Sequence, residues 1–488
     1  MTVDGFAALD VRLAHLNDTG EAVRLSYDET LHRYEWFLPS EFLSLTPRVY
    51  FHGGGTLAIG ENVYRSGDVF SAPAEETPVT ATAYDARGNL LEEVTLFVMQ
   101  ARTLPSLYID TVSGSMDDIH ADKKHLERAL FFMRDAEGAV HGQGQCVVNG
   151  RGNSSWGADQ KPYRLTLDES RTFFGLPHGR TWALLSNYGG GDWQLRNRFA
   201  LECAHRIGLS PSPGYLYINL YLNGVYNGTY LMTQEIAAQG EWFLEFDRRY
   251  ENEPYYLICR NNVFVVKKPK TPDIDASLAF QEDLDAAMHA LYDEAGEGYR
   301  AHFDLPSFLR SYWIQEFFVN WDYDFSSLYV YRNRGDRLFY AGPAWDFDKA
   351  CYRLDYGRFP LTTAQAEWIR DTELKIQWHE GNFLSELGKK DDFRKELFAF
   401  YREEMSSAVE ALLQEELPVW IESLKDSVAM EEERFNREKK ELDQDAVVLT
   451  NWIHDRKSFW DGYCAAPEDY CTVRFDFEWG IVACHVRK

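Results

Sequence analysis

The sequence has little positive charge. Its 50 Lys and Arg residues stand against 77 Asp and Glu, which gives a formal net charge of −27 over 488 residues. Such a chain is repelled by nucleic acids and anionic membranes, so we expect neither as a partner. An anionic ligand would need a local basic patch. The clearest one in the sequence is formed by Lys267, Lys268 and Lys270.

Long apolar runs are missing as well. No stretch of 18 or more apolar residues occurs, so the sequence predicts no membrane-spanning helix. The first twenty residues have neither the basic start nor the apolar middle of a signal peptide. We therefore expect a cytoplasmic location. A secreted protein whose leader has been removed is the open alternative.

Cysteine is sparse, and several common site motifs are absent. The seven scattered Cys residues include no CxxC pair, and their odd number favours reduced thiols. The thirteen His residues show no HExxH or similar zinc-ligand spacing. No GxSxG or GxxxxGK[ST] occurs, which argues against an α/β-hydrolase and a P-loop NTPase.

What the chain does contain is enough apolar material for two or three domains: 45% hydrophobic and 15% aromatic residues. Residues 1–103 show short alternating runs between turn clusters, which predicts a small β-sandwich with a structural or binding role. Residues 104–236 are mixed, with predicted strands at 215–222 and 225–234. These two are joined by Asn223-Gly224, a pair suited to a type I′ hairpin turn.

Helical patterns dominate residues 237–488. Before them, Asp192 is a good N-cap for a helix predicted over 193–207 and ended by Gly208. Apolar spacing predicts further helices over 278–292 and 305–319. A long charged segment over 392–441 predicts two helices broken near Pro418, since proline lacks the N–H that an inner helical turn uses.

One stretch, residues 320–349, combines a hairpin with two acidic clusters. The runs 328–332 and 338–341 predict strands around the turn composition of 333–336. Asp322 and Asp324 precede the first strand, and Asp346 and Asp348 follow the second. The outer ends of a hairpin lie side by side, so we expect these carboxylates to meet. A divalent cation or a phosphoryl-transfer site would suit them, while capping of a turn by Asp322 and Asp324 stays open.

Several separate segments carry a resemblance to a known family. They include Arg151-Gly-Asn-Ser-Ser-Trp156 with Lys161-Pro-Tyr-Arg-Leu165, the stretch Leu220 to Tyr230, and Gly342-Pro-Ala-Trp-Asp-Phe-Asp348. Together they resemble the CotH family of atypical protein kinases, first known from bacterial spore coats. The resemblance covers roughly residues 105–460.

The resemblance implies an α+β, two-lobed protein-kinase-like fold that uses ATP and Mg²⁺ or Mn²⁺. On this reading residues 1–103 are an accessory module. Residues 104–236 are the N-terminal lobe, and residues 237–488 are the C-terminal lobe carrying the active-site hairpin. The resemblance gives these roles: Asp322 catalytic; Asp346 and Asp348 metal-binding; Lys161, Arg151, Trp156 and Glu235 nucleotide-binding.

One position departs from the kinase pattern. Protein kinases carry an Asn five positions after the catalytic Asp, where it holds a second metal. Here that position is Ser327, whose hydroxyl is a weaker ligand. The expected activity is transfer of the γ-phosphoryl group of ATP to a hydroxyl of an unknown protein or small-molecule acceptor. Nucleotidyl transfer, ATP-dependent ligation and a non-catalytic surface or adhesion protein are the alternatives.

Overall fold

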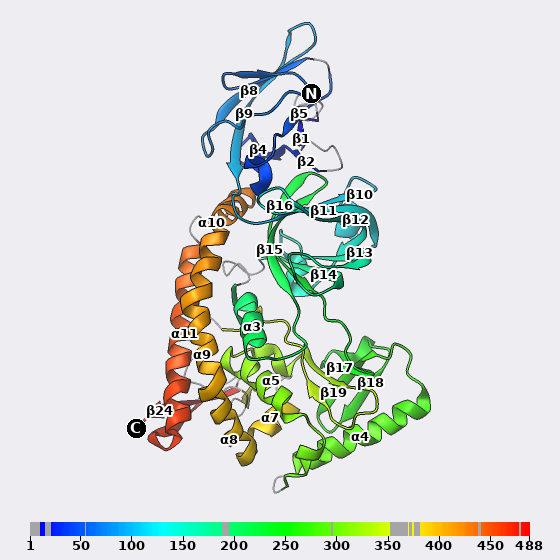
Figure 1. The fold of residues 1–488 in the computed structure, drawn as a ribbon, viewed down its shortest axis with the longest axis vertical. Helices are drawn as coiled ribbons and strands as arrows, with labels where there is room; N and C mark the ends of the chain where they lie inside the picture. Colours follow the sequence, from blue (N-terminus) through cyan, green and yellow to red (C-terminus); the bar gives the residue numbers. More distant parts are fainter. Residues whose placement is uncertain are drawn as a thin grey trace. The chain divides into compact units, whose positions relative to one another are not determined.

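A computed structural model describes residues 10–14, 21–53, 55–187, 195–293, 296–351, 369, 373–374, 381–437, 441–477 and 480–488 (Figure 1). The fold mixes helices and strands. Contacts within the chain divide it into two compact units, and neither is continuous in sequence. The first comprises Met1–Gln194, Gly214–Glu235 and Trp420–Asp443; the second comprises Leu195–Pro213, Ile236–Val419 and Gln444–Lys488.

The N-terminal region of the first unit is all-β, as predicted. It has a three-stranded sheet in the order β2-β1-β5 and a six-stranded sheet in the order β3-β4-β9-β8-β6-β7. Side chains from both sheets, such as Leu13, Val49 and Trp36, share one hydrophobic core. The strands are β1 Arg12–Ala14, β2 Ala22–Arg24, β3 Ser26–Asp28, β4 Arg33–Leu38, β5 Arg48–Tyr50, β6 Thr56–Ile59, β7 Asn62–Tyr64, β8 Val79–Tyr84 and β9 Leu90–Gln100.

The next part of the first unit is a closed barrel in the order β10-β11-β12-β13-β14-β16-β15. Only the β10–β15 pair is parallel. The predicted β15–β16 hairpin is confirmed: Asn223 and Gly224 have φ of +50° and +83°, the left-handed conformation that a type I′ turn requires. The strands are β10 Ser106–Thr111, β11 Glu127–Arg134, β12 Val140–Gly150, β13 Tyr163–Arg171, β14 Gly179–Leu185, β15 Tyr215–Leu222 and β16 Val225–Gln234, with the short helix α2 Asp117–Ala121 between β10 and β11.

The N-terminal sheets and the barrel share side chains. The core of the sheets also takes in Tyr108, Tyr221 and Tyr226 of the barrel. A buried carboxyl, Glu41, accepts hydrogen bonds from the Ser106 hydroxyl at 2.8 Å and from the Tyr108 hydroxyl at 2.6 Å. The two parts are therefore joined by apolar packing and by buried polar contacts.

A helix from late in the chain completes the first unit. In α10 (Leu417–Arg434), the buried Glu431 accepts from the backbone N–H of Thr229 at 2.6 Å and from Gln160 Nε2 at 2.9 Å. Burial raises the pKa of Glu431 to about 7, although the Arg437 guanidinium opposes the rise. Glu431 thus ties two separate barrel segments to α10.

The second unit contains a five-stranded sheet, β18-β19-β17-β20-β21, and most of the helices. Its strands are β17 Trp242–Phe246, β18 Tyr256–Cys259, β19 Asn262–Lys268, β20 Leu328–Arg332 and β21 Tyr340–Ala341, and a smaller sheet holds β22 Glu373–Leu374, β23 Tyr470–Phe477 and β24 Gly480–Arg487. Its helices are α3 Leu195–Arg206, α4 Ile274–Tyr292, α5 Leu305–Phe317, α7 Phe383–Gly388, α8 Asp391–Phe400, α9 Ser406–Ala411 and α11 Glu441–Ala465, which begins at the unit boundary.

The helix predicted over 193–207 is α3, and its proposed N-cap Asp192 lies outside the described residues. The predicted break near Pro418 is wrong. Helical structure runs from Asp391 to Arg434, with π-helical segments at Tyr401–Met405 and Leu412–Glu416, and Pro418 is the second residue of α10. The π-helical segment Leu412–Glu416, just before Pro418, already departs from hydrogen bonding between residues i and i−4. The N–H that proline lacks is therefore not needed there, and the helix continues.

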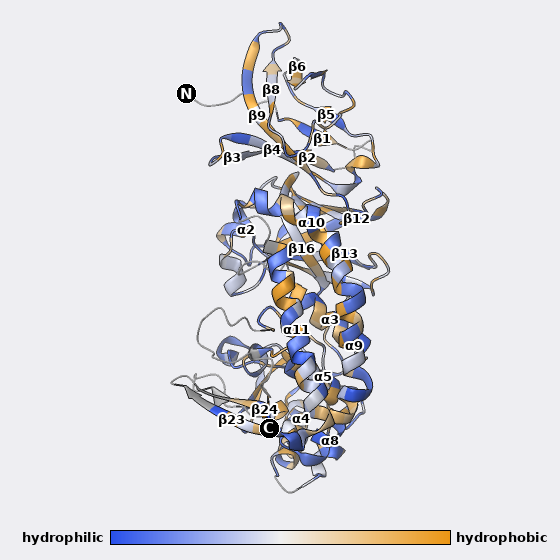
Figure 2. Cartoon of the chain, turned by 90° about the vertical axis from the view of Figure 1, so that its left-hand side faces the viewer, coloured by the Kyte–Doolittle hydropathy of each residue, from blue (hydrophilic) through white to orange (hydrophobic). Residues whose placement is uncertain are grey.

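Hydrophilic residues recur along the long helices, including α11 (Figure 2). No helix in the described part of the chain is long and apolar enough to cross a membrane. All seven cysteines are free thiols, and Cys471 is the exposed one.

Candidate functional site

The predicted hairpin of residues 320–349 is present in the second unit. Strands β20 and β21 pair antiparallel, with Val330 opposite Ala341 and Tyr331 opposite Tyr340. The first strand has the predicted bounds, and the second is shorter than predicted, covering Tyr340–Ala341. Strand β17 pairs with β20 on its other side, which fixes the hairpin in the sheet.

The two flanks of the hairpin meet, as the sequence predicts. The Ser327 hydroxyl donates to Asp346 Oδ2 at 3.1 Å. Ser327 and Asp346 both have positive φ, +64° and +65°. Such conformations are uncommon for residues other than glycine, and they gather at sites where a side chain must be aimed.

Burial and neighbouring charges raise the pKa values of Asp322 and Asp348. Burial raises the pKa of Asp322 to about 6, and the negative charge of Asp346 adds to the rise. Burial raises the pKa of Asp348 to about 7, with further contributions from Asp346 and Asp322. Lys349 lowers both pKa values. The three acids therefore lie within electrostatic range of one another.

They do not, however, form a closed three-ligand cage. In the described part of the chain, one group of three potential ligands does lie close together, on the barrel. It consists of Asp118, His125 and Glu127, whose ligand atoms are within 4.8 Å of one another. There His125 Nε2 lies 3.1 Å from Glu127 Oε2. These three residues follow no standard zinc-ligand spacing, so no sequence motif indicates this group. At the hairpin, a cation would depend on one or two carboxylates together with ligands from outside the chain.

Three amide and guanidinium groups hold the segment that carries Asp346 and Asp348. Asn197 Oδ1 accepts from the Phe347 N–H at 2.8 Å, and Arg196 donates to the Ala350 carbonyl at 3.2 Å. Asn320 Nδ2 donates to the Asp346 carbonyl at 3.3 Å. Sequence reasoning leaves the roles of Arg196 and Asn197 open between support of the site and a surface or packing role. The signal for them is the resemblance of Leu184–Tyr188 and Asp192–Asn197 to CotH family segments.

Asp324 serves the fold instead. Its buried carboxylate accepts from Arg248 at 3.1 Å and from the Gly381 N–H at 3.0 Å. Of the four acids that flank the hairpin, Asp324 is thus the one with strong structural partners.

Lys161 and Trp156 come together in the first unit. Lys161 Nζ donates to the carbonyls of Trp156 and Ala158, both at 3.2 Å, and lies 5.1 Å from the centre of the Trp156 ring. A Cβ atom at Gly150 would lie 2.4 Å from that ring, so the indole packs directly against the Gly150 backbone. The tryptophan is half-buried.

Arg151 and Glu235 belong to a second cluster of the first unit. Arg164 Nε donates to Glu235 Oε1 at 2.6 Å, and Arg151 Nε lies 3.9 Å from the same oxygen. Lys161, Trp156, Arg151 and Glu235 thus lie in the first unit. Asp322, Ser327, Asp346 and Asp348 lie in the second.

A model of the family described as CotH kinase protein matches residues 148–460, which include every one of these eight residues. The chain belongs to this family. The CotH segment begins within β12 and ends within α11, so the N-terminal sheets lie outside it.

Comparison with curated proteins found no match. Among solved structures, the chain is similar to a protein of Bacteroides thetaiotaomicron provisionally described as a glycoside hydrolase. The identity is 12%, the match covers 56% of this chain and 85% of that one, and the TM-score is 0.13. A likeness this weak adds nothing to the CotH assignment.

Proposed function

We propose that this chain transfers the γ-phosphoryl group of ATP to a hydroxyl of a protein or small-molecule acceptor in a metal-dependent reaction. Residues 104–236 and 237–488 would act as the N-terminal and C-terminal lobes of a kinase-like fold. One observation carries the proposal: a single hairpin brings Asp322, Asp346 and Asp348 into electrostatic range of one another inside the CotH segment.

The donor set fits Mg²⁺ or Mn²⁺. Carboxylate oxygens are the ligands that these ions prefer, and Mg²⁺ commonly takes one or two carboxylates plus substrate phosphates and water. Asp346 and Asp348 would hold the ion, which when bound neutralises charge on the phosphates. Ser327, which donates to Asp346 Oδ2, would hold that carboxylate in place. As a second-metal ligand it would be weak.

Asp322 would act on the acceptor. A carboxylate beside the acceptor hydroxyl orients it for in-line attack and takes its proton as the new bond forms. With a pKa of about 6, Asp322 is mostly ionised at neutral pH and more basic than an exposed aspartate.

The first unit would bind the nucleotide. We assign the triphosphate to Lys161 and Arg151, the adenine ring to the half-exposed Trp156, and a contact at the end of β16 to Glu235. Phosphoryl transfer depends mainly on such positioning and on charge stabilisation. The CotH resemblance at Arg151–Trp156 and Lys161–Leu165 supports this division of labour.

Label transfer tests the proposal. The chain is incubated with Mg²⁺ or Mn²⁺ and ATP labelled at either the γ or the α phosphate, with candidate hydroxyl acceptors, and ATP binding is measured in parallel. Transfer from the γ position alone is expected. Asp346→Ala should reduce it by about a hundredfold or more, because a ligand of the ion that neutralises phosphate charge is lost. Asp336→Ala, in the turn at the other end of the hairpin, is the matched control.

Label arriving from the α position would replace the proposal with nucleotidyl transfer. Absence of both transfer and ATP binding in the unaltered chain would overturn any ATP-dependent function.

A further inference from the structure

The outer face of the three-stranded N-terminal sheet is basic. Arg12 pairs with Arg24 on one side and with Tyr50 on the other, and Ala14 pairs with Arg48. Residues paired across strands share a face. The alternate residues of these strands, Leu13, Val23 and Val49, are buried in the core. Three arginines therefore share one face of a small sheet, in a chain with a net charge of −27.

This positive charge is only partly compensated. In the described part of the chain, Asp10 is the carboxylate in ion-pair range of this face, 3.1 Å from Arg24 and 3.6 Å from Arg12. Arg48 donates to the Gly67 carbonyl instead. The lysine patch that stands out in the sequence behaves differently. Lys267 pairs with Glu245 at 2.8 Å, and Lys268 donates to the Gly240 carbonyl at 2.6 Å.

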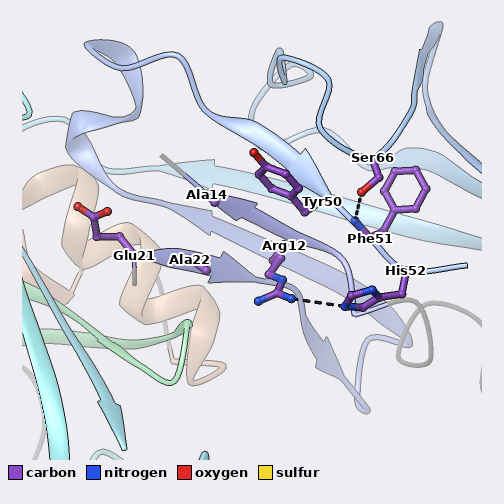
Figure 3. A pocket seen from close by; sticks show the side chains of 8 residues that line it. All are labelled: Arg12, Ala14, Glu21, Ala22, Tyr50, Phe51, His52 and Ser66. Carbon is purple, nitrogen blue, oxygen red and sulfur yellow. Dashed lines mark hydrogen bonds between the residues drawn. The ribbon is translucent and has the colours of Figure 1, made fainter. Parts of the chain in front are cut away.

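A hollow of about 340 Å³ opens over this face (Figure 3). The small side chains of Ala14 and Ala22 line the hollow between larger ones. Around it stand groups able to donate hydrogen bonds: Arg12, Tyr50, His52 and Ser66. Arg12 donates to His52 Nε2 at 3.5 Å, which links two of them.

Among the described residues that line the hollow, the one acid is already paired. Glu21 accepts from Arg134 Nε at 2.8 Å, and in Figure 3 its carboxylate turns away from Arg12 and His52. Beside Arg12, the guanidinium groups of Arg12 and Arg24 share the single carboxylate of Asp10, which leaves a net positive charge.

We propose that this hollow binds a small molecule through a phosphate monoester group, with Arg12 as the principal contact. A phosphate monoester offers three acceptor oxygens and nearly two negative charges, which suits a hollow lined by a guanidinium, a phenol, an imidazole and a hydroxyl. A carboxylate has two oxygens and one charge and uses fewer of these donors. The volume is at the small end of the roughly 300–1,000 Å³ typical of ligand pockets. The site lies outside the CotH segment and does not depend on the proposed transfer activity.

Calorimetric titration of the full chain tests the site. The probes are phenyl phosphate and benzoate, which present different anions on the same ring, at one fixed ionic strength. We expect phenyl phosphate to bind more tightly. Arg12→Gln should weaken its binding about tenfold, because a charged hydrogen-bonding group is lost. Arg87→Gln removes an exposed arginine at another turn of the same region and should leave binding unchanged.

Tyr50→Phe, which removes only a hydroxyl, provides a second variant should Arg12→Gln fail to fold. It should weaken phenyl phosphate binding several-fold. Equal affinity for benzoate would overturn the choice of phosphate. Unchanged phenyl phosphate binding in Tyr50→Phe and in a folded Arg12→Gln protein would overturn the site.

Discussion

Four buried carboxyl groups illustrate two different settings. Glu41 and Glu431 both have a pKa of about 7, and their hydrogen-bond partners are hydroxyl, amide and guanidinium groups that stabilise the fold. Asp322 and Asp348 have similarly raised pKa values, but other carboxylates contribute to the rise. Among these four groups, the neighbouring side chains, more than the size of the pKa shift, distinguish the structural acids from the candidates for chemistry.

Glu41 makes stability depend on pH. Burial raises its pKa from 4.5 in the unfolded chain to about 7 in the fold. Between these values the folded state keeps a proton that the unfolded state releases, so stability falls as pH rises. This contribution amounts to roughly 3 kcal/mol at most. Glu41→Gln mimics the neutral acid, so its free energy of unfolding, measured by urea denaturation, should fall less between pH 5 and pH 8.

Glu93→Gln, at an exposed position of β9, is the control and should keep the slope of the unaltered chain. An unchanged pH slope in Glu41→Gln would show that Glu41 is not protonated in the fold.

At the scale of elements, helices α5 and α11 are joined by an ion pair shielded from water. Arg456 donates to Glu316 Oε1 at 2.7 Å, both side chains are 0% exposed, and Arg456 Nε also donates to the Phe317 carbonyl at 3.0 Å. The other Glu316 oxygen accepts from the Ile369 N–H at 2.7 Å. The pair thus links three segments that are distant in sequence.

Breaking this pair from one side should be costly. Arg456→Met leaves the Glu316 charge buried, and we expect a loss of about 3–5 kcal/mol in the free energy of unfolding, measured by chemical denaturation. The double variant Arg456→Met with Glu316→Gln removes both charges and should recover part of that loss. A double variant no more stable than Arg456→Met alone would contradict this account.

Helix α3 should control how the acidic segment is presented. Asn197→Ala removes the acceptor of the Phe347 N–H, a loss of about 1–3 kcal/mol at that contact. We expect weaker stabilisation by Mg²⁺ in thermal denaturation and slower metal-dependent transfer. His205→Ala, at an exposed position of the same helix, should change neither. Full Mg²⁺ stabilisation in Asn197→Ala would assign Asn197 to packing alone.

For the molecule as a whole, the sequence predicts features that depend on neighbouring residues. The hairpin at Asn223-Gly224, the hairpin after Ser327 and helix α3 all follow from turn pairs, β-branched runs and apolar spacing. Features set by distant partners were not predictable in the same way. The parallel pairing of β10 with β15 closes the barrel, and Arg248 donates to Asp324. Both contacts join residues far apart in the chain, and no short stretch of sequence encodes such pairing.

The N-terminal sheets should be needed for the barrel to stay soluble. A chain without residues 1–103 would expose Tyr108, Tyr221 and Tyr226, which are at most 1% exposed in the fold. We expect a lower melting temperature and aggregation, measured by calorimetry and light scattering. Residues 1–103 added as a separate chain should partly restore solubility. A shortened chain that stays monomeric and equally stable would show that the shared core is dispensable.

The discontinuous make-up of the first unit has a consequence for biosynthesis. The chain passes from one unit to the other five times, and Trp420–Asp443 is the last segment to join the first unit. Met430 completes its core, and Glu431 contacts Thr229 and Gln160. Glu431 leaves the ribosome 202 residues after Thr229 and 271 residues after Gln160. Domains generally fold as they are made, from the N-terminus onward. Here the side of the barrel that faces α10 stays uncovered until α10 has been synthesised.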